Sequence, residues 1–418
     1  MVTKAENNFI KYIRLKNFLS YGPKGVELKL HPLNVFIGPN AAGKSNLIEA
    51  LRIIRAAAQT DPEKDISGEM SKRGSISNWI WKGEATDKVV EMQLYTASDS
   101  RLKFLVEYNI KFWESSYGTF EILEESLIRK TKIHEISHTP KADYYYQKGS
   151  SPILITYKWD KTSSLEQIMR SNDSEYTRIH DLNLNKSILS QRKDPERFPN
   201  VTYLAKQFSD IRIYRGWNLE FDSPIRRPQK TDKYQDFLLE DASNLSLIVS
   251  SLMKKVATQE LIESKIKQFY PNFNGLDFGI EGGIQIRIEE KGLYEKIPAT
   301  RISDGLLRFL CLLSILCHPN PPPVICIEEP ELNMHPDIIP TIADLLIETS
   351  SRTQLFVTTH SDILVSALTN YPESVVICER NEDGTNLKRL KKKDLLEEWL
   401  EKYKLGDLWL MNKIGGNP

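Results

Sequence analysis

The fold is decided by eight residues near the N-terminus, Gly38-Pro39-Asn40-Ala41-Ala42-Gly43-Lys44-Ser45. They match the phosphate-binding loop pattern G-x-x-x-x-G-K-[ST] at every position. A short apolar run, Asn34 to Ile37, precedes the loop, and apolar residues at helical spacing run from about Lys44 to Ala58. A strand before the loop and a helix after it are the context in which such a loop holds a phosphate chain. The stretch therefore predicts a nucleotide site in an α/β fold.

Each position of this loop has a physical reason. Gly38 and Gly43 permit backbone angles that turn successive N–H groups toward phosphate oxygens. Lys44 would place a positive charge on the β- and γ-phosphates, and the Ser45 hydroxyl would hold Mg²⁺. The helix that follows points its positive end at the same phosphates. We expect phosphate contacts from the loop and the next residue: Gly38, Pro39, Asn40, Ala41, Ala42, Gly43, Lys44, Ser45 and Asn46.

Two adjacent carboxylates end a second apolar strand, Val324-Ile325-Cys326-Ile327-Glu328-Glu329-Pro330-Glu331. One carboxylate can bind the Mg²⁺ shell, and the next can orient or deprotonate an attacking water. The alternative is an acidic loop after a buried strand. Beside a phosphate-binding loop, the pair favours a site for nucleotide hydrolysis.

Two further motifs are weak in isolation. In Ile302-Ser303-Asp304-Gly305-Leu306-Leu307-Arg308, the serine is expected to be the N-cap of an apolar helix. A helix N-terminus with a hydroxyl and unpaired amides suits a phosphate, although simple capping is the alternative. In Phe356-Val357-Thr358-Thr359-His360-Ser361, a strand delivers a histidine at its C-terminal end, where α/β active sites lie. A lone histidine there is often incidental.

The order of these four motifs resembles that of ABC-type ATPase heads, in the branch shared by SMC proteins, RecF and the OLD-family ATPases. The opening Ile13-Arg14-Leu15-Lys16-Asn17-Phe18 is similar to that branch. The tail, with Leu405 to Trp409 and Gly415 to Asn417, is most similar to stand-alone bacterial AAA family ATPases without a Toprim domain. The resemblance implies an α/β head with a parallel core sheet that carries the phosphate-binding loop. It also implies an antiparallel β subdomain and a helical or irregular insertion.

The resemblance also implies roles for single residues. Glu328 is similar to the metal-binding carboxylate and Glu329 to the catalytic glutamate, while His360 is similar to the switch histidine. Ser303 and Gly305 are similar to the signature that meets the γ-phosphate held by the opposite subunit. The expected cofactors are ATP and Mg²⁺, with ATP sandwiched between the heads of a homodimer and Lys44, Glu329 and His360 as the catalytic set. Two further loops are expected at Asn333 to His335, which would cross the dimer axis, and at Gln229, our choice for the glutamine loop.

Three departures from the wider family bear on function. Glu328 stands where the wider family usually has aspartate. OLD-like ATPases share this replacement by glutamate. Asp304 and Arg308 stand where transporter ATPases have glycine and glutamine, which argues against a transporter subunit. The stretch after His360 is short and the sequence has no Asp-x-Asp pair, so we do not expect a Toprim nuclease in this chain.

Composition sets broader limits. A chain of 418 residues exceeds the size at which one core keeps growing, so two lobes are expected. Lys plus Arg and Asp plus Glu both total 56, and this balance is less basic than that of a dedicated nucleic-acid binder. The four cysteines lie in apolar runs without a CxxC pair, which indicates buried reduced thiols. No segment resembles a signal peptide or a membrane span, so we expect a cytoplasmic protein that does not enter the membrane.

We divide the chain into an N-terminal lobe with the phosphate-binding loop and an antiparallel sheet (1–129), an irregular insertion (130–235) and a C-terminal lobe with signature, carboxylate strand and histidine (236–418). One interpretation of the insertion is a nucleic-acid surface, in which Tyr144 to Tyr146 stack on bases and several arginines contact phosphates. A solvated polar insertion is the alternative. The arginines concerned are Arg170, Arg178, Arg192 and Arg197.

Three functions remain open at this point. The first is an ATP-driven dimeric switch in DNA repair or anti-phage defence, with a separate effector such as a nuclease supplied in trans. The second is an SMC-like head that grips DNA directly. The third, disfavoured by the signature, is a transporter motor.

Overall fold

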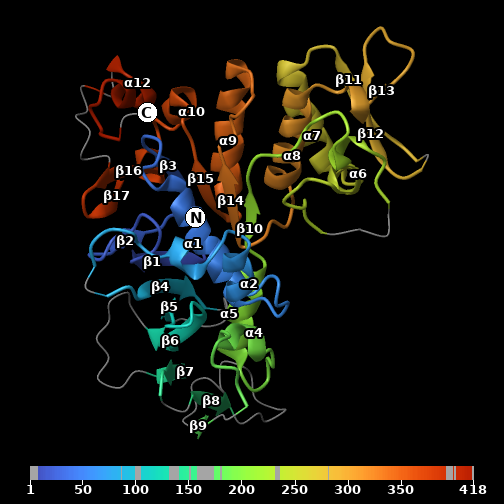
Figure 1. Cartoon of the computed structure of the whole chain (residues 1–418). Helices are drawn as coiled ribbons and strands as arrows, with labels where there is room; N and C mark the ends of the chain where they lie inside the picture. The colour runs from blue at the N-terminus through green and yellow to red at the C-terminus, as the bar shows by residue number, and fades with distance from the viewer. Residues whose placement is uncertain are drawn as a thin grey trace, which may run out of the picture.

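The computed structural model describes residues 8–85, 87–98, 105–130, 141–149, 152–157, 174–178, 181–230, 236–280, 282–391, 399 and 402–416. Within them the strands form three sheets, of six, eight and three strands (Figure 1). The six-stranded sheet is the core, the eight-stranded sheet lies below it in Figure 1, and the three-stranded sheet belongs to a helical lobe beside it.

The core sheet has the strand order β10-β14-β15-β3-β16-β17. Neighbouring strands from β10 to β16 pair in parallel, and β17 pairs antiparallel with β16. Because the parallel strands end at one edge, the segments that follow β3, β14 and β15 meet there. The strands are β10 (Arg212–Tyr214), β14 (Val324–Glu328), β15 (Gln354–Thr358), β3 (Leu33–Ile37), β16 (Val375–Asn381) and β17 (Gly384–Arg389).

The core strands are buried on both faces, which explains their unbroken apolar sequences. In β3, Val35 and Ile37 pack into one hydrophobic cluster and Phe36 into the other. Successive residues of β14 and β15 also point alternately into the two clusters. The first cluster joins the sheet to the helical lobe, and the second joins it to α1 (Lys44–Ala57) and the antiparallel sheet. The parallel α/β core expected from the sequence is therefore confirmed.

The helical lobe contains α6 (Leu245–Met253), α7 (Val256–Phe269) and α8 (Asp304–Leu316), with a small sheet of β11, β12 and β13. Helical periodicity across Ser243 to Tyr270 corresponds to two helices, because the chain turns at Lys254 and Lys255 between them. A hairpin at Gly282 and Gly283, both with positive φ, joins β11 to β12. Its strands are β11 (Phe273–Gly279), β12 (Gln285–Glu290) and β13 (Ile297–Pro298). Helices α9 (Ile339–Ser350) and α10 (Asp362–Ala367) pack into the same hydrophobic cluster as this lobe, with α9 between α8 and the core strands in Figure 1.

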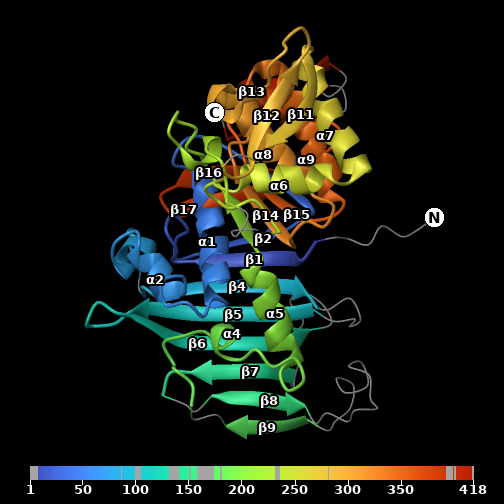
Figure 2. The same ribbon diagram turned by 90° about the vertical axis from the view of Figure 1, so that its right-hand side faces the viewer.

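The antiparallel sheet has the order β2-β1-β4-β5-β6-β7-β8-β9. Figure 2 shows its strands stacked below the core, with α1, α5 (Pro199–Ser209) and α4 (Ile188–Gln191) lying across one face. Alternate residues of β5 share a face of the sheet, and Tyr108 and Phe112 of β5 are buried toward these helices. The strands are β2 (Val26–Lys29), β1 (Ile10–Lys16), β4 (Val90–Ala97), β5 (Leu105–Glu114), β6 (Phe120–Lys130), β7 (Lys141–Gln147), β8 (Ile153–Tyr157) and β9 (Ser174–Arg178).

Much of the segment 130–235 that the structure describes is regular, contrary to the irregular insertion expected from its composition. Strands β7 to β9 extend the antiparallel sheet, α4 and α5 cover it, and β10 joins the core sheet. Composition misled because the Lys, Asp and Ser residues around these short strands suggested a solvated segment, whereas β7 and β8 themselves carry strand-forming Tyr, Ile and Thr residues. The three-part division of the chain stays a proposal.

Two of the three tyrosines considered for a nucleic-acid surface are buried. Tyr144 and Tyr146 are 3% and 4% exposed and pack into the second hydrophobic cluster. Arg192 forms an ion pair with Asp181 at 2.6 Å. Arg170 and the side chain of Arg178 lie outside the described residues. The four cysteines are buried and free, as expected. Among the described helices, none has the length and apolar character needed to cross a membrane.

Candidate nucleotide-binding site

The phosphate-binding loop lies between β3 and α1 and takes the backbone shape that its glycines allow. Gly38, Ala41 and Gly43 have φ of 146°, 62° and 97°. Asn40 and Ala41 are exposed at the tip, whereas Ala42 and Gly43 are buried beneath it. Helix α1 begins at Lys44 without a side-chain cap, so its first amides are left for a ligand.

A polar cluster supports the loop from below. Tyr21 donates a hydrogen bond to the Gly43 carbonyl at 3.1 Å, and Thr385 of β17 donates one to the Ala42 carbonyl at 2.8 Å. The Ser20 hydroxyl accepts a hydrogen bond from the side-chain amide of Asn46 and shares one with the Thr385 hydroxyl, at 2.7 Å each. A Cβ at Gly43 would collide with this cluster, so the position requires glycine for space as well as for φ.

The Lys44 side chain folds back over the loop. Its ammonium donates to the carbonyls of Gly38 and Pro39, at 2.7 and 2.9 Å. Burial lowers its pKa, and the nearby Cys378, Glu329 and Glu331 oppose that shift. A cation held in the mouth of the loop is suited to a phosphate oxygen.

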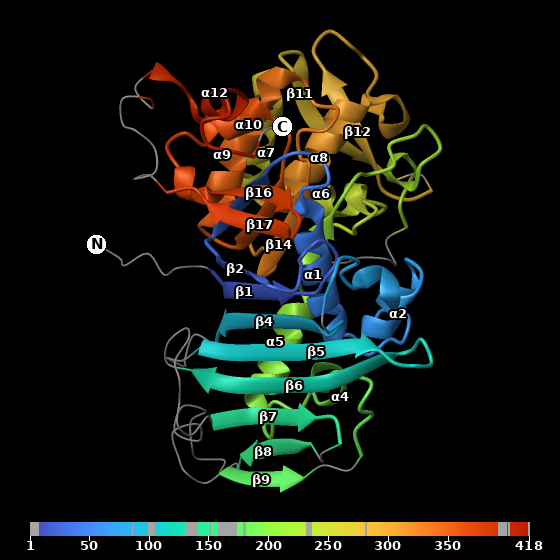
Figure 3. The same cartoon turned by 60° about the vertical axis from the view of Figure 1, so that its left-hand side comes forward.

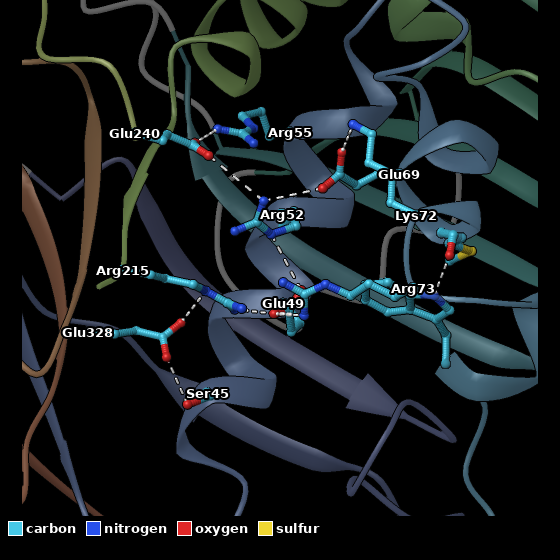
Figure 4. Close-up of polar contacts among 12 residues, drawn as sticks. Ser45, Glu49, Arg52, Arg55, Glu69, Lys72, Arg73, Arg215, Glu240 and Glu328 are labelled. Carbon is cyan, nitrogen blue, oxygen red and sulfur yellow. Dashed lines mark hydrogen bonds and ion pairs between the residues drawn. The ribbon is translucent and has the colours of Figure 1, made fainter. Parts of the chain in front are cut away.

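Ser45 and Glu328, the two expected metal ligands, lie side by side. The Ser45 hydroxyl donates to Glu328 Oε2 at 3.0 Å, across 283 positions of the chain. Burial raises the pKa of Glu328, while Arg215 and Ser45 act against that shift. Figure 4 shows Glu328 between Ser45 and Arg215, which lies just after β10. A hydroxyl and a carboxylate at this spacing are ligands that suit a hard divalent cation.

Glu329 takes a left-handed backbone conformation, with φ of 47°. Its amide donates to the Thr358 carbonyl at 2.9 Å, which ties the end of β14 to β15. The side chain is 43% exposed, and Glu329 Oε1 lies 3.9 Å from Nε2 of His360. Burial and the charge of Lys44 lower the pKa of His360, so the imidazole is neutral near pH 7.

Glu331 is a site residue to which the sequence analysis gave no role. Its Oε1 accepts hydrogen bonds from the Thr359 hydroxyl at 2.6 Å and from the His360 amide at 2.9 Å. Burial raises its pKa. The third carboxylate of the Glu-Glu-Pro-Glu stretch was the available signal, but its partners lie on another strand.

The signature lies at the start of α8. Ser303 caps the helix by accepting from the Leu306 amide at 3.4 Å, and both Ser303 and Asp304 are exposed. Arg226 is buried and donates to the carbonyls of Ala299 and Ile302, at 2.9 and 2.7 Å, and its guanidinium also pairs with Asp304. The start of this helix is thus held in place while its serine faces outward.

The loop expected to cross the dimer axis lies beside the signature. A Cβ at Gly305 would be 3.6 Å from the Asn333 carbonyl oxygen. Asn333 has a left-handed φ of 57°, and Asn333 and His335 are exposed. Two exposed segments, each separately predicted to face a second subunit, therefore form one surface of this chain.

Gln229, our choice for the glutamine loop, lies in the helical lobe. It is buried, its backbone bridges to Ile284, and its side-chain oxygen accepts from the Leu247 amide at 3.2 Å. Arg215, in contrast, follows β10 directly and contacts Glu328. Sequence reasoning missed Arg215 because β10 has only three residues and no strand pattern.

The C-terminal tail packs against the phosphate-binding loop. Helix α12 (Leu405–Leu410) lies beside α10 (Figure 3), with Gly406 against the Asp362 carbonyl. The Trp409 indole donates to the Gly416 carbonyl, and the Gly416 amide donates to Glu379 at 2.9 Å. A Cβ at Gly416 would be 3.6 Å from Cα of Gly38. The glycines of the tail are therefore needed for close packing behind the loop.

Comparison with known proteins agrees with this geometry. The family described as "AAA domain, putative AbiEii toxin, Type IV TA system" matches residues 33–366, which is most of the chain. An ATP/GTP phosphatase of Helicobacter pylori is 22% identical over 376 residues, or 86% of this chain and 87% of that protein. The DNA replication and repair protein RecF of Clostridium novyi is 26% identical over 188 residues, or 40% of this chain and 51% of RecF.

Solved structures show the same fold. An Smc head bound to the C-winged helix domain of ScpA has a TM-score of 0.52 at 14% identity, covering 93% of this chain and 100% of that one. The Smc head with an extended coiled coil, bound to the C-terminal domain of ScpA from Pyrococcus furiosus, has a TM-score of 0.53 at 12% identity. It covers 94% of this chain and 99% of its own. The chain thus belongs to the AAA domain family of putative AbiEii toxins and is an ATPase of the SMC and RecF type.

Proposed function

We propose that this protein binds ATP with Mg²⁺ and hydrolyses it at a site completed by a second copy of the chain. The observation that carries the proposal is the meeting of Lys44, Ser45, Glu328 and Glu329 at one edge of the core sheet. The signature serine, in contrast, faces outward on the helical lobe.

Each residue has a distinct task in this proposal. The loop from Gly38 to Asn46 wraps the phosphates with its amides, and Lys44 moves from its carbonyl partners to the β- and γ-phosphates. Glu329 is exposed enough to reach an attacking water and acts as its general base. His360, neutral and 31% exposed, contacts the γ-phosphate, and Glu331 holds its backbone.

The chemistry of the site fits Mg²⁺. Ser45 and Glu328 would ligate it, and no group of three or more acidic, His or Cys residues in the described chain could hold a metal alone. Mg²⁺ is usually held by one or two protein oxygens together with substrate phosphates, which is what this pair can offer. When bound, the ion would neutralise charge that develops on the phosphates.

The dimer follows from the resemblance to ABC-type heads, in which the signature meets a phosphate held by the opposite subunit. Ser303, Gly305 and Asn333 are on one surface, and Arg226 fixes the start of α8 beneath them. ATP would thus draw two heads together, and hydrolysis would release them.

The output is proposed to lie in a second molecule, such as a nuclease supplied in trans in DNA repair or anti-phage defence. The family description names a toxin–antitoxin system, which has two components. Purified protein is expected to hydrolyse ATP without metal-dependent DNA cleavage. The alternative is direct DNA binding, favoured by the RecF relatives, and a gel shift with duplex DNA, with and without ATP, separates the two.

Mixing two inactive variants tests the shared site. Ser303→Arg should bind ATP but not hydrolyse it, because a bulky cation blocks closure on the partner's nucleotide. Lys44→Ala should bind ATP only weakly, so its own site stays inactive. A mixture should recover part of the activity, since one of its two composite sites is intact. Ser75→Arg, at another exposed serine before a short helix, is the matched control and should remain active. No recovery from folded proteins would rule out the shared-site dimer.

A further inference from the structure

Arg215 connects the metal-binding side of the site to a buried carboxylate in α1. Its Nε lies 2.6 Å from Glu328 Oε1, and its terminal nitrogen forms an ion pair with Glu49. The side chain is 29% exposed, against 16% for Glu328 and 5% for Glu49. Figure 4 shows the guanidinium between the two carboxylates.

Both oxygens of Glu328 already have partners within the protein. Ser45 donates to Oε2 at 3.0 Å, and Arg215 pairs with Oε1 at 2.6 Å. A divalent ion held by Ser45 and Glu328 would need lone pairs at this same carboxylate. It would also lie within a few ångströms of the guanidinium, and two cations so close in a half-buried place repel each other. Arg215 and the metal ion therefore compete for Glu328.

Glu49 gives Arg215 a place to remain when it leaves Glu328. Besides Arg215, Glu49 pairs with Arg73 and, at 3.4 Å, with Arg52. Arg52 also pairs with Glu240, just before the helical lobe, at 3.8 Å. Because three guanidinium groups surround Glu49, its negative charge stays compensated when one of these groups moves. Arg215 can thus release Glu328 without leaving a buried carboxylate unpaired.

We propose that Arg215 is the exchangeable counter-ion of Glu328: it neutralises this carboxylate until the metal ion that accompanies the nucleotide takes its place. Arg215 is a positioning residue in this role. This inference rests on the proposed nucleotide and metal site. Arg215 also favours metal-free nucleotide binding, because without it the bare Glu328 carboxylate would repel the phosphates. With the metal present, loss of Arg215 removes a competitor.

The test is the affinity for a fluorescent ADP analogue, measured with excess EDTA and again with saturating Mg²⁺. Substitution Arg215→Met should weaken binding in EDTA and strengthen it in Mg²⁺. The dissociation constant in EDTA divided by that in Mg²⁺ should rise about tenfold over the wild-type ratio. This is a typical size for coupling between two ligands. Arg215→Lys keeps a cation near Glu328 and should stay closer to wild type.

Arg73→Met is the matched control. Arg73 also pairs with Glu49 but has no contact with Glu328 among the described ion pairs, so its loss should leave the ratio unchanged. A merely structural role of Arg215 would change both dissociation constants in the same direction, and a ratio that stays at the wild-type value would overturn the inference. If wild type and Glu328→Gln show the same ratio, the metal site itself is wrong and the inference falls with it.

Discussion

Glu331 accepts a hydrogen bond from the backbone amide of His360, at 2.9 Å, and so joins the loop after β14 to the loop after β15. A second bond, from the Thr359 hydroxyl at 2.6 Å, strengthens the same link. Because the carboxylate is largely buried, losing these two hydrogen bonds is costly, since water cannot readily replace them. The position of His360 thus depends on a residue that need not touch the nucleotide.

Glu331→Ala is therefore expected to lower kcat by about 10- to 100-fold, in the range of misplaced acid–base or polar groups. Affinity for ATP should change little, because Glu331 makes no contact with the phosphate-binding loop among the described hydrogen bonds. Steady-state kinetics and nucleotide binding measure the two effects. Glu331→Gln retains an acceptor oxygen and should be milder. Equal losses in both variants would mean that charge, rather than the bond to His360, is what matters.

The stability of the protein should depend on pH through Glu331. Burial raises the pKa of this carboxyl above its unfolded value of about 4.3. Its contribution to folding is then fully present below the unfolded pKa and is lost as pH rises through the higher folded pKa. Relative to Glu331→Gln, the wild type should lose melting temperature as pH rises from about 4. A difference between the two melting curves that stays constant with pH contradicts this account.

Lys44→Ala should weaken ATP binding by about 10- to 100-fold, the range for losing charge-assisted hydrogen bonds. The reason is that the phosphates lose the ammonium held at the mouth of the loop. Calorimetry measures the affinity directly. Lys24→Ala removes a more exposed lysine, paired with Asp383, and should bind like wild type. An unchanged affinity in Lys44→Ala would refute the assigned loop.

Glu329→Gln should bind ATP but hydrolyse it at least roughly 10²-fold more slowly, a usual loss for a general base. Because release depends on hydrolysis, the variant should accumulate as an ATP-bound dimer in size-exclusion chromatography. Glu289→Gln changes a similarly exposed carboxylate in the hairpin of the helical lobe and serves as the control. Normal turnover by Glu329→Gln would place the base elsewhere.

Local motifs explain what could be predicted from sequence. The loop at 38–45 and the strand that ends in Glu328 and Glu329 each carry their meaning within a few residues, so their elements were expected correctly. Strand β10 has three residues, and in β17, at the sheet edge, Leu387 is the one apolar side chain among polar residues. Neither has the length or pattern by which a single sequence reveals a strand.

The missed site residues have a different cause. Arg215 lies 166 positions from Glu49 and far along the chain from Glu328, and Glu331 meets Thr359 only because β14 and β15 pair in register. Partnerships of this kind are fixed by the sheet and not by any short motif. Gln229 was chosen for its residue type, but the fold commits its side chain to α6.

The C-terminal tail packs closely behind the phosphate-binding loop. Gly416 has a φ of 62°, and a Cβ there would lie 2.6 Å from Cγ2 of Ile377 and 3.6 Å from Cα of Gly38. A larger side chain must push the tail or the loop aside. Since Gly38 begins the phosphate-binding loop, Gly416→Val should weaken ATP binding, by about tenfold if it costs the equivalent of one hydrogen bond.

Gly282→Val separates this effect from backbone strain. Gly282 has a similar φ of 72°, but a Cβ there would meet nothing within 4 Å. Both variants strain a left-handed residue, and only Gly416→Val presses on the loop. Calorimetric affinity should fall for Gly416→Val alone, while the melting temperature should fall for both. If Gly282→Val weakens ATP binding equally, strain suffices as the cause, and the tail has no specific part in shaping the loop.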